Sequence, residues 1–153
     1  MSKDTVVRFK KKPAYNVAIM GATGAVGVEM AQILEERKFP IANIVFLASE
    51  RSAGKKLRFR GKTHTVKLLT EDSFDGIDIV LASAGGSISK KFAPAVLKAG
   101  AVMIDNTSAF RMDPDVPLVI PEINPQEIRN CGKKRIIANP NCSTIVALVA
   151  LNP

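Results

Sequence analysis

The sequence has 153 residues, of which 46% are hydrophobic and 24% charged, and this composition fits one globular domain and excludes collagen-like and disordered chains. Its formal net charge of +8 comes largely from residues 8–12 and 51–62, and the chain has one Tyr and no Trp to stack on bases. A small phosphate-bearing ligand and a solvated basic tail explain this charge, so we expect no nucleic-acid partner.

The first segment, residues 1–13, is polar and basic and predicts a tail or a processing remnant. Nothing in the chain has the pattern of a secretory signal or a membrane span, so we expect no membrane partner. Two cysteines do not make a disulfide framework. We therefore expect a reducing compartment, either the cytoplasm or an organellar stroma.

Apolar runs alternate with helical patterns through residues 14–141, which is typical of parallel βαβ units. The patterns predict buried strands at 15–20, 44–48, 77–82, 101–105 and 135–138, and helices at 24–38 and 87–99. Residues 58–69 predict a pair of short antiparallel strands around Gly61. The expected fold class is therefore α/β, with a doubly wound, mostly parallel Rossmann-like sheet.

A glycine loop, GATGAVG, joins the first predicted strand to the first helix. Gly21, Gly24 and Gly27 would let backbone N–H groups approach a pyrophosphate at the helix N-terminus and would pack the helix closely on the strand. The G-x-x-G-x-x-G spacing differs from the commoner G-x-G-x-x-G, and a tight turn without a ligand is the alternative. Its place between a strand and a helix favours a dinucleotide site.

The end of the second strand should select between NAD and NADP. Glu50 could accept a hydrogen bond from a ribose 2′-hydroxyl, which would indicate NAD. Against it stand Arg51, whose guanidinium suits a phosphate, and Ser52 and Lys55, which can also donate. We favour NADP. Lys55 and its neighbour Lys56 could also be ordinary residues of a solvated basic loop.

Two further segments follow strands that should end at the same edge of the sheet. Ser83 opens a run of small residues that would let a cofactor pass close to the backbone, whereas Ser87 is expected to cap the following helix. Arg111 is a candidate anion clamp, and Asn106 an orienting hydrogen-bond donor. His64 lies in a polar stretch and is expected to face solvent. The two cysteines and the single, distant histidine do not have the spacing that metal ligands usually show. We therefore expect no metal.

Cys142 lies at the start of a predicted apolar helix, residues 142–151, which we expect to be buried. Pro140 and Asn141 are the signals for the start of this helix. A thiol there meets unpaired backbone N–H groups and the positive end of the helix dipole, which favour the nucleophilic thiolate. Asn141 could donate an amide N–H to a developing oxyanion. A small buried core residue is the alternative reading of this cysteine.

Together these segments resemble aspartate-semialdehyde dehydrogenase from residue 15 to the end. Six motifs of this family occur here in the same order as in its members. They are GATGAVG (21–27), ASERSAGK (48–55), SAGGSIS (83–89), DNTSAFR (105–111), VIPEINP (119–125) and NPNCSTI (139–145). The resemblance implies NADP-dependent reduction of L-aspartyl 4-phosphate to L-aspartate 4-semialdehyde, in the biosynthesis of lysine, threonine and methionine.

By the same resemblance, Cys142 forms an acyl-thioester with help from Asn141, and Arg111 binds the substrate phosphate. Thr23, Gly24, Ala25 and Val26, together with Arg51 and Ser52, would hold NADP. A thiolate suits this role because it attacks acyl phosphates readily and leaves readily from the thioester.

Family members continue well beyond the cysteine into a catalytic and dimerisation domain, which supplies a glutamine, a histidine acid/base, an arginine and a C-terminal helix. We therefore expect residues 14–141 to be the NADP-binding domain and 142–153 the first helix of a truncated catalytic domain. Homodimerisation is implied for the full-length enzyme, and the 153 residues alone are expected to be inactive. The alternatives are a non-catalytic NADP-binding fragment and the related N-acetyl-glutamyl-phosphate reductase.

Overall fold

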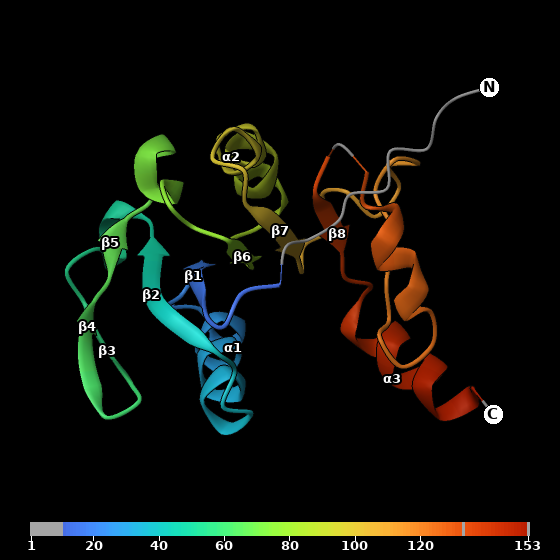
Figure 1. Cartoon of the computed structure of the whole chain (residues 1–153), viewed down its shortest axis with the longest axis horizontal. Helices are drawn as coiled ribbons and strands as arrows, with labels where there is room; N and C mark the ends of the chain where they lie inside the picture. The colour runs from blue at the N-terminus through green and yellow to red at the C-terminus, as the bar shows by residue number, and fades with distance from the viewer. Residues whose placement is uncertain (1–10, 133, 153) are drawn as a thin grey trace.

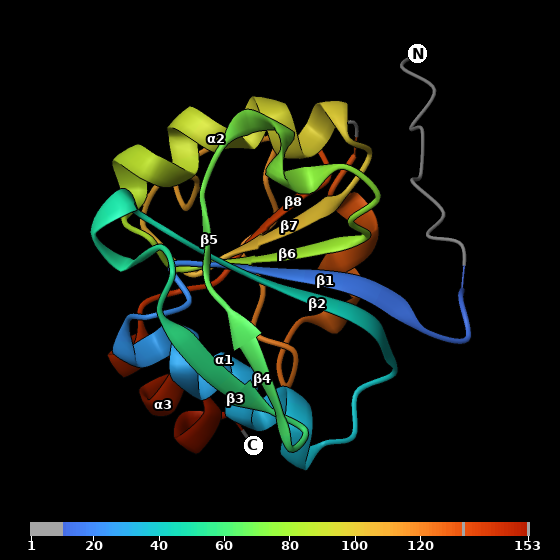
Figure 2. The same ribbon diagram turned by 90° about the vertical axis from the view of Figure 1, so that its left-hand side faces the viewer.

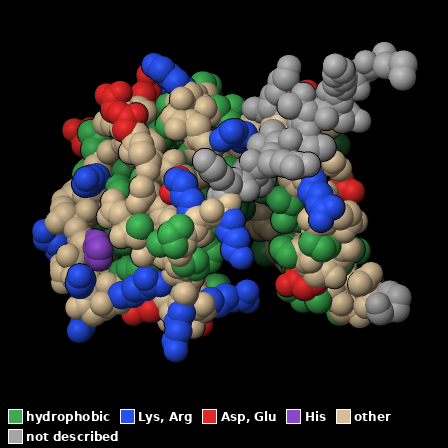
Figure 3. Space-filling view, viewed as in Figure 1, with side chains coloured by type: hydrophobic (Ala, Val, Ile, Leu, Met, Phe, Trp, Pro, Cys, Tyr) green, Lys and Arg blue, Asp and Glu red, His purple; other side chains and the backbone are tan. Residues whose placement is uncertain are grey.

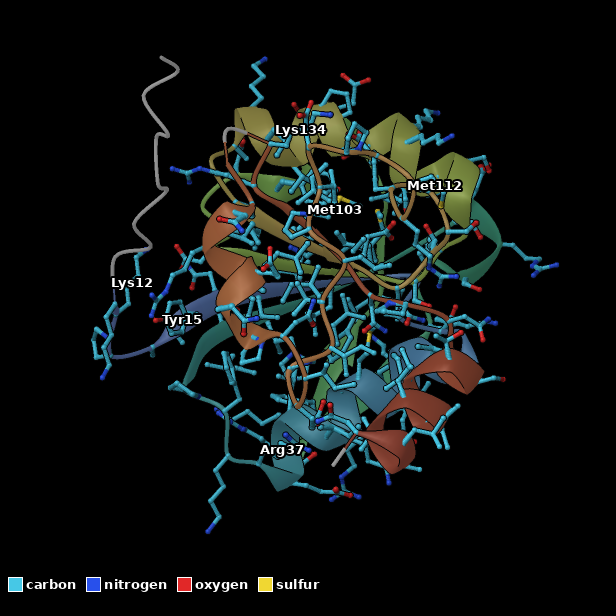
Figure 4. The ribbon with its side chains drawn as sticks, turned by 90° about the vertical axis from the view of Figure 1, so that its right-hand side faces the viewer. Lys12, Tyr15, Arg37, Met103, Met112 and Lys134 are labelled. Atoms are coloured by element: carbon cyan, nitrogen blue, oxygen red, sulfur yellow. The ribbon has the colours of Figure 1, made fainter. Side chains whose placement is uncertain are left out.

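The computed structural model describes residues 11–132 and 134–152. Most of the predicted basic tail, residues 1–10, therefore lies outside the described residues. Where the described chain begins, Figure 4 shows Lys12 beside Tyr15 at the start of β1, and the Lys12 backbone N–H donates to the Tyr15 hydroxyl at 3.2 Å. The same view shows Met103 in the centre of the molecule, where it is fully buried.

Six parallel strands form the main sheet, in the order β5-β2-β1-β6-β7-β8. Their bounds are β1 Tyr15–Met20, β2 Ile41–Ala48, β5 Lys67–Leu68, β6 Ile79–Ala82, β7 Val102–Asp105 and β8 Ile136–Ala138. The order confirms the predicted doubly wound, Rossmann-like α/β fold. It reverses direction between β1 and β6, and sheets of this kind bind ligands beyond the carboxyl ends of the strands at such a point.

Helices cover the two faces of the sheet. α1 (Ala25–Glu36) connects β1 to β2 on one face, and α2 (Gly86–Lys98) connects β6 to β7 on the other, as Figure 2 shows. Phe92 and Val96 of α2 pack with Met103 in one hydrophobic cluster, whereas Ala31 of α1 packs with Phe46 in another. α2 begins one residue before Ser87, with Gly85 as its N-cap, so the predicted Ser87 cap was wrong.

An antiparallel hairpin, β3 (Lys56–Phe59) and β4 (Lys62–Thr65), stands beside the sheet as predicted. His64 does not simply face solvent, because its half-buried ring meets Phe46 and Phe59 edge-on at centroid distances of 5.6 and 6.1 Å. Figure 3 shows Lys and Arg side chains over this hairpin. Acidic side chains gather nearby over η2 (Glu71–Phe74), the short 3₁₀ turn after β5.

The last helix, α3 (Cys142–Leu151), has the predicted bounds but not the predicted burial. Every described residue in it except Ile145 is exposed, including Val146 at 71% and Leu151 at 77%. The prediction was wrong because a helix that is apolar all round indicates burial only where other segments surround it. Figure 1 shows α3 set apart from α1, beyond β8. None of the helices in the described chain is long and apolar enough to cross a membrane.

Candidate cofactor and catalytic site

Backbone hydrogen bonds bring the carboxyl ends of four neighbouring strands together. Ser83 donates its N–H to the Met20 carbonyl at 2.8 Å, and Asn106 donates to the Ala82 carbonyl at 2.9 Å. Asn139 then donates to the Asp105 carbonyl at 2.8 Å. The loops after β1, β6, β7 and β8 therefore lie side by side, and each carries residues that the sequence marked as functional.

The glycine loop is closed against the loop after β6. Gly21 has a φ of +87°, and a Cβ built on it would lie 2.5 Å from the Ser83 carbonyl oxygen. A Cβ on Gly27 would lie 2.3 Å from the Gly21 carbonyl oxygen. Both positions therefore require glycine for close backbone packing, as the predicted dinucleotide loop does.

The N-terminus of α1 is open to a ligand. Its N-cap, Gly24, provides no side-chain cap, and Ala25 and Val26 are exposed while Thr23 is half-buried. The first N–H groups of a helix have no partner within the helix and attract anions such as phosphates. This end of α1, next to Ser83, fits the diphosphate of a dinucleotide.

Arg51 and Ser52 lie in η1 (Glu50–Ser52), the 3₁₀ turn after β2. Arg51 is exposed, whereas Ser52 is only 6% exposed. Gly21 and Ala22 both donate backbone N–H groups to the Leu47 carbonyl, at 2.9 and 3.1 Å, so the end of β2 borders the glycine loop. The two predicted parts of the cofactor site are thus neighbours, with Arg51 free of side-chain partners among the described residues.

Arg111 ties the loop after β7 to the loop that leads to the cysteine. Its Nε donates to the Asn139 carbonyl at 2.9 Å, and its Nη2 donates to the Asn106 carbonyl at 3.1 Å. The side chains of Asn139 and Asn106 also meet, Nδ2 to Oδ1 at 2.7 Å. The half-buried guanidinium keeps Nη1 without a hydrogen-bond partner among the described residues, so it can still bind an anion.

Cys142 is the first residue of α3, three residues after Asn139, and it is exposed. Asn141 is the N-cap as predicted, because its Oδ1 accepts from the Ser143 N–H at 3.0 Å. Its amide Nδ2 makes no hydrogen bond within the described chain and can donate. Cys131, in contrast, is a buried free thiol, and burial raises its pKa above the ordinary value. Of the two thiols, Cys142 is the one a substrate can reach.

The sequence reasoning missed Asn139 and Asp105. Asn139 was not given a role of its own from the sequence, although its side chain and carbonyl hold the two loops together. Asp105 looked like the last residue of a strand, but its carboxylate is fully buried and accepts three hydrogen bonds. An acidic residue ending an apolar strand is the signal that could have marked it, because a buried carboxylate needs partners.

No group of three or more His, Cys, Asp or Glu side chains in residues 11–132 and 134–152 could hold a metal ion. A cavity of about 570 Å³, lined by Tyr15, Ile79 and Val102 among others, lies at the opposite, amino-terminal end of the strands. The candidate site lies at the other, carboxyl-terminal edge of the sheet.

Comparison with known proteins places the chain in a family. The model of the NAD-binding domain of semialdehyde dehydrogenase matches residues 16–131. The chain belongs to the semialdehyde dehydrogenase family. This match covers the glycine loop and Arg111, and it ends before Cys142.

Named relatives of this semialdehyde dehydrogenase domain are similar over more of the chain. Aspartate-semialdehyde dehydrogenase of Aquifex aeolicus is 61% identical over 140 residues, which are 91% of this chain and 41% of that protein. The crystal structure of aspartate semialdehyde dehydrogenase II from Vibrio cholerae, complexed with ASA, is 55% identical with a TM-score of 0.88, covering 92% of this chain and 46% of that one.

A more distant structure is aspartate semialdehyde dehydrogenase with NADP from Candida albicans, at 26% identity and a TM-score of 0.77. The match covers 92% of this chain and 46% of the Candida albicans chain. The chain spans about two fifths of the length of the curated relatives it matches. The fold and the family are thus shown for this domain.

Proposed function

We propose that the protein carrying this domain is an NADP-dependent aspartate-semialdehyde dehydrogenase. It would reversibly reduce L-aspartyl 4-phosphate to L-aspartate 4-semialdehyde and phosphate. The observation that carries the proposal is the pair of hydrogen bonds from Arg111 to the carbonyls of Asn106 and Asn139, which puts its guanidinium beside the loop of an exposed cysteine. The dinucleotide loop on the same sheet edge supports it, as do relatives named for this activity.

The cofactor would lie along the glycine loop. Backbone N–H groups from Thr23 to Val26 would receive the diphosphate, with Gly21 and Gly27 allowing its approach and Ser83 bordering it. Arg51 and Ser52 would receive the 2′-phosphate that distinguishes NADP from NAD. The Candida albicans relative with NADP supports this choice. Bound NADPH would supply the hydride that reduces the thioester carbon.

The chain's own residues would carry the acyl transfer. The Cys142 sulfur attacks the acyl carbon of aspartyl phosphate, and phosphate leaves toward the free Nη1 of Arg111. The Asn141 amide donates to the oxyanion that forms on the attacked carbonyl, since its oxygen is occupied by the Ser143 N–H. After reduction, the Cys142 thiolate departs and the semialdehyde is released.

The remainder of the proposal concerns the whole protein. Residues 14–141 would form the cofactor domain, and α3 would begin the catalytic domain. Family resemblance assigns proton transfer, substrate-carboxylate recognition and homodimerisation to residues after Cys142. The enzyme would work in the cytoplasm or an organellar stroma, in the biosynthesis of lysine, threonine and methionine, without a nucleic-acid or membrane partner.

A substrate comparison tests the proposal. The full-length protein is assayed by NADPH absorbance with phosphate, NADP and either L-aspartate 4-semialdehyde or N-acetyl-L-glutamate 5-semialdehyde. We expect kcat/KM for the aspartate compound to be higher by about 100-fold or more, because a site built for one polar substrate rejects the other strongly. Preference for the acetylated substrate, or turnover that does not require phosphate, would contradict the proposal.

A further inference from the structure

The buried carboxylate of Asp105 holds the loop that follows β7. Thr107 donates to it twice, from its backbone N–H at 3.2 Å and from its Oγ1 at 2.7 Å. Ser89 of α2 adds a third bond at 2.8 Å. Thr107 Oγ1 in turn accepts the Ala109 N–H at 3.1 Å. One fully buried carboxylate therefore fixes the loop's turn to both its strand and a helix of the scaffold.

The residue between Asp105 and Thr107 is Asn106, which connects this anchor to the candidate site. The Asn106 carbonyl accepts from Arg111 Nη2, and its side-chain oxygen accepts from Asn139 Nδ2. Arg111 Nε reaches the Asn139 carbonyl. A rigid Asn106 therefore fixes the guanidinium and the start of the cysteine loop at the same time.

We propose that Asp105 and Thr107 are positioning residues, which set the place of Arg111 relative to the Cys142 loop. This inference rests on the proposed function and adds to it two residues that touch neither substrate nor cofactor. The physical reason is that acyl transfer depends on sub-ångström placement of the phosphate-binding group and the nucleophile. Arg111 lies on a loop and Cys142 directly follows one, and loops are mobile unless the scaffold holds them.

The variant Thr107→Val tests this role, because it keeps the shape of the side chain but removes the hydroxyl that bonds Asp105 and Ala109. Thr107→Ser restores the hydroxyl. The matched control is Thr70→Val, the same chemical change at the N-cap of η2, where Thr70 Oγ1 bonds Ser73 Oγ at 3.0 Å. Each variant is made in the full-length protein and its folding is verified by thermal unfolding.

Two readouts separate positioning from stability. One is the alkylation rate of Cys142 by iodoacetamide with and without inorganic phosphate, measured by peptide mass spectrometry so that Cys131 does not contribute. The other is the division of the kinetic effect between kcat and the KM for NADPH. We expect Thr107→Val to weaken phosphate protection by about 5-fold or more and kcat by about 10-fold or more, with KM for NADPH within about 2-fold.

Thr107→Ser and Thr70→Val are expected to match the wild type in both readouts, even where Thr70→Val lowers the unfolding temperature. If Thr107→Val behaves like Thr70→Val while phosphate protects the wild type, the positioning role is wrong and the proposed function stands. If phosphate does not protect the wild type and aspartate semialdehyde is not turned over, both the positioning role and the proposed function are wrong.

Should Thr107→Val fail to fold, Asp105→Asn replaces it. That variant keeps the shape and the Oδ1 acceptor but loses the Oδ2 acceptor, and we expect the same two effects.

Discussion

At the residue scale, Gly21 shows how closely the glycine loop depends on the absence of a side chain. Its φ of +87° is a conformation that other residues rarely adopt, and a Cβ there would lie 2.5 Å from the Ser83 carbonyl oxygen. The backbone of the loop after β6 cannot move away easily, because Ser83 is also bonded to Met20. Any substitution at this position would therefore lower stability for two reasons, which are the strained backbone conformation and the overlap with Ser83.

Gly21→Ala is predicted to destabilise the domain by more than the roughly 1–2 kcal/mol of a left-handed alanine and to weaken NADP binding. The control is Gly100→Ala, because Gly100 has a similar φ of +78° but nothing within 4 Å of its added Cβ. Denaturant unfolding and calorimetric titration with NADP measure the two effects. Equal losses of stability in the two variants would show that contact with Ser83 is unimportant.

Asn141 caps α3, and we propose that it also acts as a catalytic hydrogen-bond donor. Asn141→Asp keeps an oxygen for the Ser143 N–H, since Asp caps helices as well as Asn, but it loses the amide donor. We predict unchanged thermal stability with kcat lowered by about 100-fold or more, the cost of losing an oxyanion donor. Asn141→Ala should lose both, with about 1 kcal/mol less stability. Normal turnover by Asn141→Asp would show that the Asn141 amide is not needed as a hydrogen-bond donor.

At the element scale, Asp78 joins the amino ends of the two central strands. Its carboxylate accepts from the Asn16 N–H of β1 at 2.9 Å and pairs with the Lys12 ammonium. Partial burial pushes the pKa of the Asp78 carboxyl upward. The hydrogen bonds from Lys12 and Asn16 and the Lys12 charge together hold that pKa below its usual value. The charged carboxylate therefore stabilises the folded state.

A lowered folded-state pKa has a defined pH signature. The stabilisation is fully present above the unfolded-state pKa, and it is lost as pH falls below about 4 through the folded-state value. Asp78→Asn should be less stable at neutral pH by about 0.5–1.5 kcal/mol and should lose less stability on acidification. Urea unfolding between pH 6 and pH 3 measures this. Asp75→Asn, at an exposed carboxylate nearby, is the control and should follow the wild type. Parallel pH curves for wild type and Asp78→Asn would contradict the account.

The sequence predicted the elements that bury continuous apolar surface. β1, β6, β7, β8, α1 and α2 all lie within two residues of their predicted bounds at each end. β2 begins three residues earlier than predicted, and the two-residue β5 was read as part of the hairpin. Both errors concern segments that are largely exposed, where the residues give little periodic signal and pairing with a neighbouring strand decides the structure.

The candidate site was predictable where its chemistry depends on local sequence, as for the glycine loop and the capped helix start at Asn141. It was not predictable where it depends on contacts between loops distant in sequence. Arg111 was expected to bind an anion, but its bond to Asn139, 28 residues away, follows only from the pairing of β7 with β8. The burial of α3 was predicted wrongly because it depends on segments packed around the helix, which the helix's own composition does not show.

At the scale of the whole molecule, the net charge of +8 is unevenly distributed, with basic side chains over the β3–β4 end (Figure 3). We predict that Arg51→Ala reduces the preference for NADP over NAD by about 10-fold or more, because one guanidinium would meet the 2′-phosphate. Arg58→Ala removes the same charge from an exposed site on β3 and should leave the preference unchanged. Fluorescence titrations with both reduced cofactors measure the ratio. If both variants lost the preference for NADP equally, the preference would come from the general attraction of positive charge and not from Arg51 itself.

We propose above all that Cys142 carries the acyl group. The most direct measurement is peptide mass spectrometry of the full-length protein, quenched in acid after mixing with L-aspartate 4-semialdehyde and NADP in the absence of phosphate. We predict an aspartyl adduct on the Cys142 peptide that is lost on adding phosphate and absent in Cys142→Ser. An adduct on another residue, or phosphate-dependent turnover by Cys142→Ser, would contradict the account.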